Sequence, residues 1–196
     1  MARNGPTDEA ILQPHVRSIS VITSLGLDTS SKLVGWGVIS GGDGELNHIA
    51  SGVIKLNDNL RHPVRRVRLL TKLGEILNKY RPDRVTIEEM SSLRNQKVVK
   101  ILQGYIVAAE IAVVMHGSME PQMLAIQTIM SRIGVKALTP QQKKQIPGTK
   151  AQRSKEISRI GKSRIRAVIN AQFDLDIGEK EQDRADALAV ALAGLG

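Results

Sequence analysis

The chain has 196 residues, no cysteine and a formal net charge of +9. A chain of this length is most simply one domain that buries about 70% of its unfolded surface. The lack of cysteine excludes disulfides, thiol nucleophiles and thiolate metal sites, and it fits a reducing compartment. No uninterrupted apolar run reaches the roughly 18 residues of a membrane span, so we expect no membrane partner.

The excess positive charge is confined to one segment of the chain. Residues 136–166 contain ten lysines and arginines and a single acid, Glu156, and the basic and acidic residues elsewhere cancel. Such a segment suits a polyanion, although a solvated, partly disordered loop is the alternative. Aromatic residues make up only 2% of the chain, which disfavours binding through stacked bases and favours a duplex backbone.

In chain order, the pattern predicts an α/β protein. Residues 1–17 show no periodicity and are expected to be a flexible arm, followed by a single domain over 18–196. Strands are predicted at 21–28, 33–39, 46–56, 84–88 and 123–127, and helices at 60–80, 96–116, 128–134, 155–173 and 183–195. Three antiparallel strands followed by alternating strands and helices predict a mixed five-stranded sheet with helices on both faces.

The two long central helices carry apolar stripes. Residues 57–59, Asn-Asp-Asn, supply a capping signal for the helix at 60–80, whose core stripe is predicted to be Val64, Val67, Leu70, Leu73, Leu77 and Tyr80. The helix at 96–116 is amphipathic and is our candidate for a contact between subunits.

Acidic residues end two of the predicted strands. Asp28 shares a sheet face with Ser24 and Gly26, whose small side chains leave room for another element to approach. An aspartate there needs hydrogen-bond donors or a cation. Glu88 and Glu89 end the fourth strand and point to opposite faces, so alternation alone does not say which one is functional.

The last helix carries two further acids on one face. Asp183 and Asp186 are three residues apart in a helix that is apolar nearly all round from Ala185 onward, so Asp186 should lie against protein. Asp183 taken alone reads as a helix N-cap, but an N-cap does not account for Asp186.

Three or four buried acids cannot all remain ionised unless cations lie between them. Ligation by oxygen alone favours Mg²⁺ or Mn²⁺ over Zn²⁺. Two such ions about 3.5–4 Å apart are the apparatus of phosphodiester hydrolysis. Together with the basic segment, the acids indicate a nuclease.

Three motifs then match a known family in order and spacing. LGLDTSSKLVGWGVI, RVTIEE and DRADALAVAL resemble the acidic motifs of the RuvC family of Holliday-junction resolvases. The resemblance implies a ribonuclease H-like fold and a homodimer that binds four-way DNA junctions and nicks two opposed strands symmetrically. It implies two divalent ions, Mg²⁺ or Mn²⁺, no small-molecule cofactor, and the cytoplasm of a bacterial or phage-infected cell. Asp28-Thr29-Ser30 in the first motif is closer to the phage branch than to the bacterial aspartate-proline-glycine.

The resemblance also implies the roles of single residues. The metal ligands would be Asp28, Glu88, Asp183 and Asp186, and Lys162, which opens KSRIRAVI, would lie near the scissile phosphate, with an ordinary surface lysine as the alternative. Residues 137–161 look like an insertion relative to compact members. DNA contacts are expected from Arg94, Lys143, Lys144, Lys150, Arg153, Lys155 and Lys162.

Other functions remain open at this point. A related nuclease could act on other branched DNA or on structured RNA precursors. A sugar-kinase or actin-type ATPase shares the strand–turn–strand with an aspartate, but it needs two such domains, which 196 residues do not supply. A non-catalytic DNA-binding module is favoured only if one of the acids fails to reach the site.

Overall fold

The structure, a computed structural model, describes residues 21–90 and 95–196. The expected arm at 1–17 and the expected DNA contact Arg94 lie outside the described residues. Both therefore stay predictions, as does the assignment of 18–196 to a single domain.

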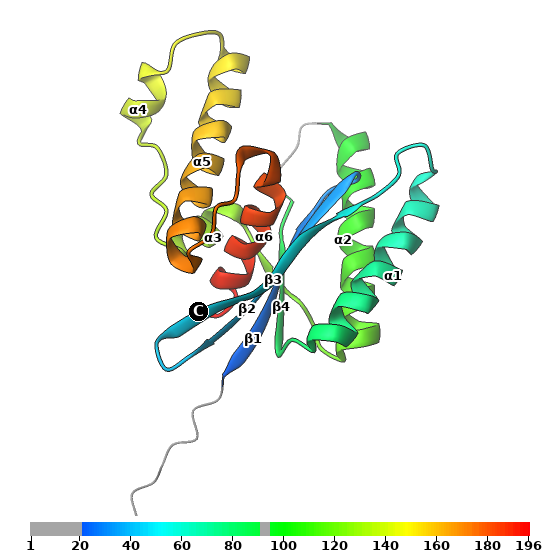
Figure 1. Ribbon diagram of the computed structural model, residues 1–196. Helices are drawn as coiled ribbons and strands as arrows, with labels where there is room; N and C mark the ends of the chain where they lie inside the picture. Colours follow the sequence, from blue (N-terminus) through cyan, green and yellow to red (C-terminus); the bar gives the residue numbers. More distant parts are fainter. Residues whose placement is uncertain (1–20, 91–94) are drawn as a thin grey trace, which may run out of the picture.

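A mixed five-stranded sheet forms the centre of the molecule (Figure 1). Its strands are β1 (Ile22–Thr29), β2 (Leu33–Gly42), β3 (Glu45–Lys55), β4 (Arg84–Glu88) and β5 (Gln122–Leu124). Their order across the sheet is β3-β2-β1-β4-β5, with β1 to β3 antiparallel and β4 and β5 parallel to β1. The predicted sheet is confirmed, with β5 shorter than expected.

Helices cover both faces of the sheet, as predicted (Figure 1). One face carries α1 (His62–Tyr80) and α2 (Gln96–Gly117), and the other carries α3 (Ile126–Arg132), α5 (Lys150–Phe173) and α6 (Gln182–Ala193). A short helix, α4 (Pro140–Gln145), precedes α5, and a 3-10 turn, Glu179–Glu181, precedes α6. Each face has its own apolar core.

The helix α1 begins later than predicted, and its apolar face is rotated. Asn57 closes a turn, accepting from the Asn59 amide at 3.0 Å, so it does not cap the helix, which starts at His62. The expected core residues Val64 and Val67 are exposed, whereas Leu73 and Leu77 are buried as predicted. The first turns of α1 therefore leave an apolar surface beside α2.

The helix α2 is long and apolar enough to span a membrane by length and composition alone. Its apolar residues are interrupted by Lys100, Gln103 and Glu110, which is why no uninterrupted run was found in the sequence. One side of the helix, including Tyr105, Ala109 and Val113, is buried in the core on α1 and the sheet.

The helix α6 lies directly on β1 and β2 because the strands present glycines to it. A Cβ atom at Gly26 would overlap the backbone of Ala187 and Ala191, and one at Gly35 would overlap the Asp183 carbonyl. The Ser24 hydroxyl also donates to the Ala191 carbonyl at 2.8 Å. The small side chains beside Asp28 thus make room for another element, as predicted, and that element is α6.

The basic segment is largely helical, which does not fit the alternative of a disordered loop. Capping boxes begin both helices, with Thr139 and Gln142 at α4 and Thr149 and Gln152 at α5. As a result α5 starts five residues before the predicted position. Helix α4 has no buried residue and the first turns of α5 are exposed, and both extend beyond the sheet (Figure 1).

Candidate active site

Asp28 and Glu88 lie at the same edge of the sheet. Strands β1 and β4 are parallel neighbours in which Leu27 pairs with Ile87, so the next residue on each strand is an acid at its carboxyl end. Glu89 is exposed, and its amide donates to the Leu124 carbonyl at 2.8 Å. Of the two adjacent acids between which alternation could not choose, Glu88 is therefore the candidate for the site and Glu89 is not.

Helix α6 brings a third acid to this edge. Asp186 is buried, with 5% of its surface exposed. Its Oδ1 accepts from Gln182 Nε2 at 2.8 Å, and its Oδ2 accepts from Lys162 Nζ at 3.1 Å. Gln182 also donates to the Lys162 carbonyl at 3.1 Å, which ties α5 to the start of α6. These contacts fix Asp186 and Lys162 relative to each other.

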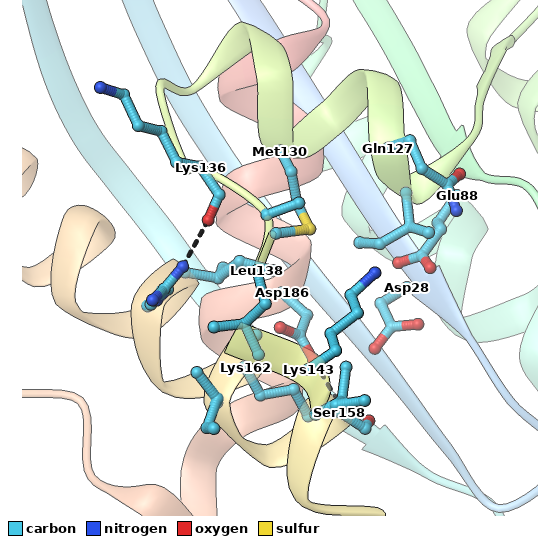
Figure 2. Close-up of a pocket in the computed structure, with 17 residues that line it drawn as sticks. Asp28, Glu88, Gln127, Met130, Lys136, Leu138, Lys143, Ser158, Lys162 and Asp186 are labelled. Atoms are coloured by element: carbon cyan, nitrogen blue, oxygen red, sulfur yellow. Dashed lines mark hydrogen bonds and ion pairs between the residues drawn. The ribbon is translucent and has the colours of Figure 1, made fainter. Parts of the chain in front are cut away.

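The three acids line one cavity of about 450 Å³ (Figure 2). Asp28 and Glu88 enter it from the sheet, Asp186 from α6 and Lys162 from α5. The opposite wall is formed by α3, by residues 136–138 and by α4. Three of the four predicted acids, up to 158 sequence positions apart, are thus brought to one place.

Asp183 stands beside this cavity rather than in its lining. It lies in the first turn of α6, whose N-cap residue is Glu181, so the N-cap interpretation of Asp183 was wrong. Its negative charge nonetheless contributes to raising the pKa of Asp28 and of Asp186. Asp183 is therefore close enough to act electrostatically on the cluster.

The cluster carries more negative charge than its surroundings neutralise. Burial, and then the charge of Asp186, raise the pKa of Asp28 to about 7, against the opposing effect of Lys162. Burial, and then the charges of Asp28 and Asp186, raise the pKa of Glu88 to about 8. Burial also raises the pKa of Asp186, although Lys162 and Gln182 oppose it. Near neutral pH the cluster therefore binds protons when nothing else neutralises it.

The donor set fits a divalent ion. All candidate ligands are carboxylate oxygens, and among the described residues nothing donates a hydrogen bond to the carboxylate of Asp28 or of Glu88. In the described chain, no three acidic or histidine side chains already stand in coordinating positions. Both oxygens of Asp186 accept hydrogen bonds, so holding an ion would require a change in the contact between Asp186 and Lys162.

The predicted DNA-contacting residues divide into two groups. Lys143 and Lys162 line the cavity with the acids. The others are exposed on α4 or on the first turns of α5, and these are Lys144, Lys150, Arg153 and Lys155. Sequence reasoning missed Gln182, although its position four residues before Asp186 on a helix was a usable signal.

The sheet order, with acids at the ends of two parallel strands and on the last helix, defines the ribonuclease H-like class of nucleases. Comparison with known proteins then identifies the family. The family profile described as crossover junction endodeoxyribonuclease RuvC matches residues 24–194. The chain belongs to this family, whose members are endodeoxyribonucleases that depend on divalent metal ions.

Individual relatives agree with this assignment. Crossover junction endodeoxyribonucleases RuvC from Caldicellulosiruptor saccharolyticus and Citrifermentans bemidjiense are each 30% identical, covering 86% of this chain and 89% and 88% of theirs. The structure of Thermus thermophilus RuvC in complex with a Holliday junction substrate is similar with a TM-score of 0.67 at 16% identity, covering 88% of this chain and 91% of that one. These relatives are bacterial, and the likeness to a phage branch stays a prediction.

Proposed function

We propose that this chain resolves four-way DNA junctions by paired, symmetric, metal-dependent nicks. The observation that carries the proposal is the convergence of Asp28, Glu88 and Asp186 from three distant elements on one cavity, beside the basic segment of α4 and α5. The relatives are named for cleavage of crossover junctions, and the Thermus thermophilus relative is bound to one.

In this proposal Asp28, Glu88 and Asp186 hold two divalent ions, Mg²⁺ or Mn²⁺, with Asp183 as a further ligand on the same helix face. Such ions, when bound, activate the attacking water and stabilise the leaving oxygen. The raised pKa values of Asp28 and Glu88 support this assignment, because a cation would replace the protons that the cluster otherwise binds.

Lys162 is proposed to meet the scissile phosphate. Its side chain is half-exposed, and its ammonium lies 3.1 Å from Asp186 Oδ2. If Asp186 were to hold a metal ion, the Lys162 ammonium would no longer be its partner and could turn toward phosphate oxygens within the cavity. A cation at this position stabilises the charge that develops in the transition state.

The exposed basic residues of α4 and α5 are proposed to follow the junction arms. Lys150, Arg153 and Lys155 form no ion pair with the described residues, so their charges remain available for phosphates. Contacts of this kind position a duplex without reading its sequence.

Paired nicking requires two active sites, and we propose a homodimer formed through α1 and α2. An apolar groove of about 570 Å³ runs between these helices, lined by Val67, Leu70, Val107, Ala108 and Ile111 among others. Val67 is 64% exposed and Ile111 44%. Apolar surface of this kind is a common feature of subunit interfaces. The predicted subunit helix at 96–116 is α2, and the cytoplasmic location stays a prediction.

Cleavage-site mapping on a synthetic four-way junction with Mg²⁺ tests the proposal. Wild-type protein is expected to nick two opposed strands at symmetric positions. Asp28→Asn should lower the nicking rate by more than roughly 100-fold, which exceeds the loss typical of groups that only support a metal ligand. Junction binding should persist because the basic segment is unchanged.

Two controls sharpen this experiment. Asp43→Asn changes an exposed acid in the β2–β3 turn and should nick like the wild type. A structured RNA and a branched DNA without a crossover, at matched salt, distinguish the alternative substrates. Preferential cleavage of either one, or full activity of Asp28→Asn, would contradict the proposal.

A further inference from the structure

Four cationic side chains line the active-site cavity. Two of them are held by hydrogen bonds, and a third points away from the acids. Lys162 is bonded to Asp186, and Arg164 Nη1 donates to the Lys136 carbonyl at 2.6 Å. The Lys136 ammonium points away from the acids (Figure 2). Lys143 is the fourth.

Lys143 differs from the other three in where it comes from and where it points. It lies on α4 and extends into the cavity, with its ammonium directed toward the side where Asp28 and Glu88 lie (Figure 2). Among the described residues its ammonium forms no ion pair or hydrogen bond.

The structure holds α4 at this place by its flanks rather than by a core of its own. Leu138, just before α4, is half-buried in the cavity wall, and the Thr139–Gln142 capping box fixes the first turn. No residue of α4 is buried. The orientation of Lys143 therefore follows from the capped helix, and its long side chain remains free to adjust to a ligand.

We propose that Lys143 is a catalytic residue of the nuclease, which contacts a non-bridging oxygen of the scissile phosphate. The inference rests on the proposed junction-cleaving function. Hydrolysis forms a bond from water oxygen to phosphorus and breaks the bond from phosphorus to the leaving sugar oxygen. The attacking water gives up one proton to solvent, and the leaving oxygen takes up one proton from solvent to become a hydroxyl. Lys143 keeps its proton throughout and neutralises charge that develops on the phosphate oxygen.

This role separates Lys143 from its neighbours on the basic segment. A phosphate in contact with ions held by Asp28, Glu88 and Asp186 must enter the cavity that Lys143 lines. Lys150 and Arg153 do not line that cavity. The basic segment thus supplies an active-site group as well as a DNA-binding surface.

Single-turnover nicking at saturating enzyme tests the inference. Lys143→Met keeps an unbranched apolar stem, one atom shorter than lysine, and should lower the saturated rate roughly 100-fold, the usual effect of removing one donor to a transition-state oxyanion. Its junction dissociation constant should change by no more than about threefold, because one phosphate contact is a small part of the total. Lys143→Arg should restore most of the rate.

A phosphorothioate at the scissile position supplies a second readout. If Lys143 contacts the substituted oxygen, sulfur should slow the wild type more than Lys143→Met. Sulfur accepts a hydrogen bond from the ammonium less well than oxygen does, and the variant has no ammonium at this position. Gln145→Ala, on the same helix and outside the cavity lining, is the matched control and should behave as the wild type.

The outcomes separate this inference from the function on which it rests. If the wild type does not nick four-way junctions, the proposed function fails first. If the wild type and Gln145→Ala nick normally while Lys143→Met has an unchanged saturated rate, or loses only affinity, the catalytic role of Lys143 is overturned and the proposed function stands.

Discussion

Asp28 and Glu88 illustrate how burial and charge prepare a metal site at the scale of single residues. Each carboxylate ends a parallel strand, is desolvated there, and feels the negative charge of at least one other acid. A lone lysine, Lys162, offsets only part of that charge. Near neutral pH the negative charge of the cluster is therefore neutralised either by protons bound to the carboxylates or by a cation.

This arrangement predicts how stability without metal depends on pH. Burial and neighbouring acids raise the pKa of Asp28 to about 7 and of Glu88 to about 8, above the ordinary values of 3.8 and 4.5. The folded state thus holds more protons than the unfolded state at pH values between the ordinary pKa and the raised pKa of each group. The free energy of unfolding without metal should fall as pH rises from about 4 to about 8 and change little beyond.

Added Mg²⁺ should oppose this fall in the free energy of unfolding with rising pH, because it displaces the same protons from Asp28 and Glu88. Each tenfold gain in affinity is worth 1.4 kcal/mol once metal is in excess, or about 3 to 6 °C in melting temperature for a chain of this size. The melting temperature is measured without Mg²⁺ and at Mg²⁺ concentrations raised in tenfold steps, at pH 6 and at pH 8.5. A metal-induced shift that is larger at pH 6 than at pH 8.5 would contradict the assignment.

At the scale of elements, the contact between α6 and the sheet determines where Asp186 stands. Gly26 and Gly35 allow the helix backbone to touch β1 and β2, and the Ser24 hydroxyl fixes the far end of the contact. Any side chain at these glycines pushes α6 outward and moves Asp186 away from Asp28. The position of the acid therefore depends on residues that carry no chemistry.

Gly26→Ala is expected to cost about 3 kcal/mol or more in the free energy of unfolding, because the added methyl overlaps helix backbone that cannot rotate away. Gly161→Ala is the matched control, since a Cβ there meets nothing within 4 Å and the position is helical. It should be neutral or stabilise by up to about 1 kcal/mol. Equal unfolding midpoints in urea for the two variants would rule out the close packing.

The elements that the sequence predicts well are those with strong periodicity and buried faces. Strand β1, α2 and the apolar α6 follow their patterns closely because core packing and local preference agree. The helix α4 was missed because six exposed residues give no periodicity, although its capping box was readable. The start of α1 was misplaced because Asn57 offers the same signal for a turn as for a cap.

The candidate site was predicted less evenly than the fold. Three of the four acids in the motifs line one cavity, and the small residues beside Asp28 predicted the approach of another element, which is α6. The separation of Asp183 from the cavity lining could not be foreseen, because helical spacing places it on the same face as Asp186 without fixing which acid faces inward. Likewise, nothing in the sequence places Lys143 opposite acids that lie over 40 positions away.

At the scale of the whole molecule, two surfaces on opposite faces of the sheet divide the work that we propose. The α4 and α5 side carries the basic segment and the cavity, and the α1 and α2 side carries the exposed apolar groove (Figure 1). A dimer through the groove leaves both basic surfaces accessible. That geometry suits a substrate with more than one duplex arm.

Ile111→Glu should convert the proposed dimer into a monomer, because a charge in the groove remains unpaired when a second copy packs on it. Sedimentation equilibrium measures the mass of the assembly. Ile49→Glu on the edge strand β3 is the matched control, since Ile49 and Ile111 are each 44% exposed. A wild-type protein that is monomeric at micromolar concentration would remove the proposed interface.

The basic surface predicts a salt dependence of junction binding. Replacing Lys150, Arg153 and Lys155 by alanine should weaken binding and flatten the plot of log affinity against log salt by about 0.9 for each phosphate that the variant no longer neutralises. Alanine at Lys55, Arg68 and Lys79, which lie away from the basic segment, removes the same charge as a control. Equal slopes for the two triple variants would mean that α5 does not follow the DNA.

The proposed chemistry requires that Asp28, Glu88 and Asp186 share divalent ions. Anomalous diffraction from crystals grown with Mn²⁺ is the decisive measurement, because it locates the ion independently of activity. We expect anomalous peaks within the cavity that mark Mn²⁺ ions in contact with oxygens of all three carboxylates. These peaks should be lost in Asp28→Asn. Manganese bound elsewhere, or no ion among these carboxylates at saturating Mn²⁺ and pH 8.5, would contradict the shared site.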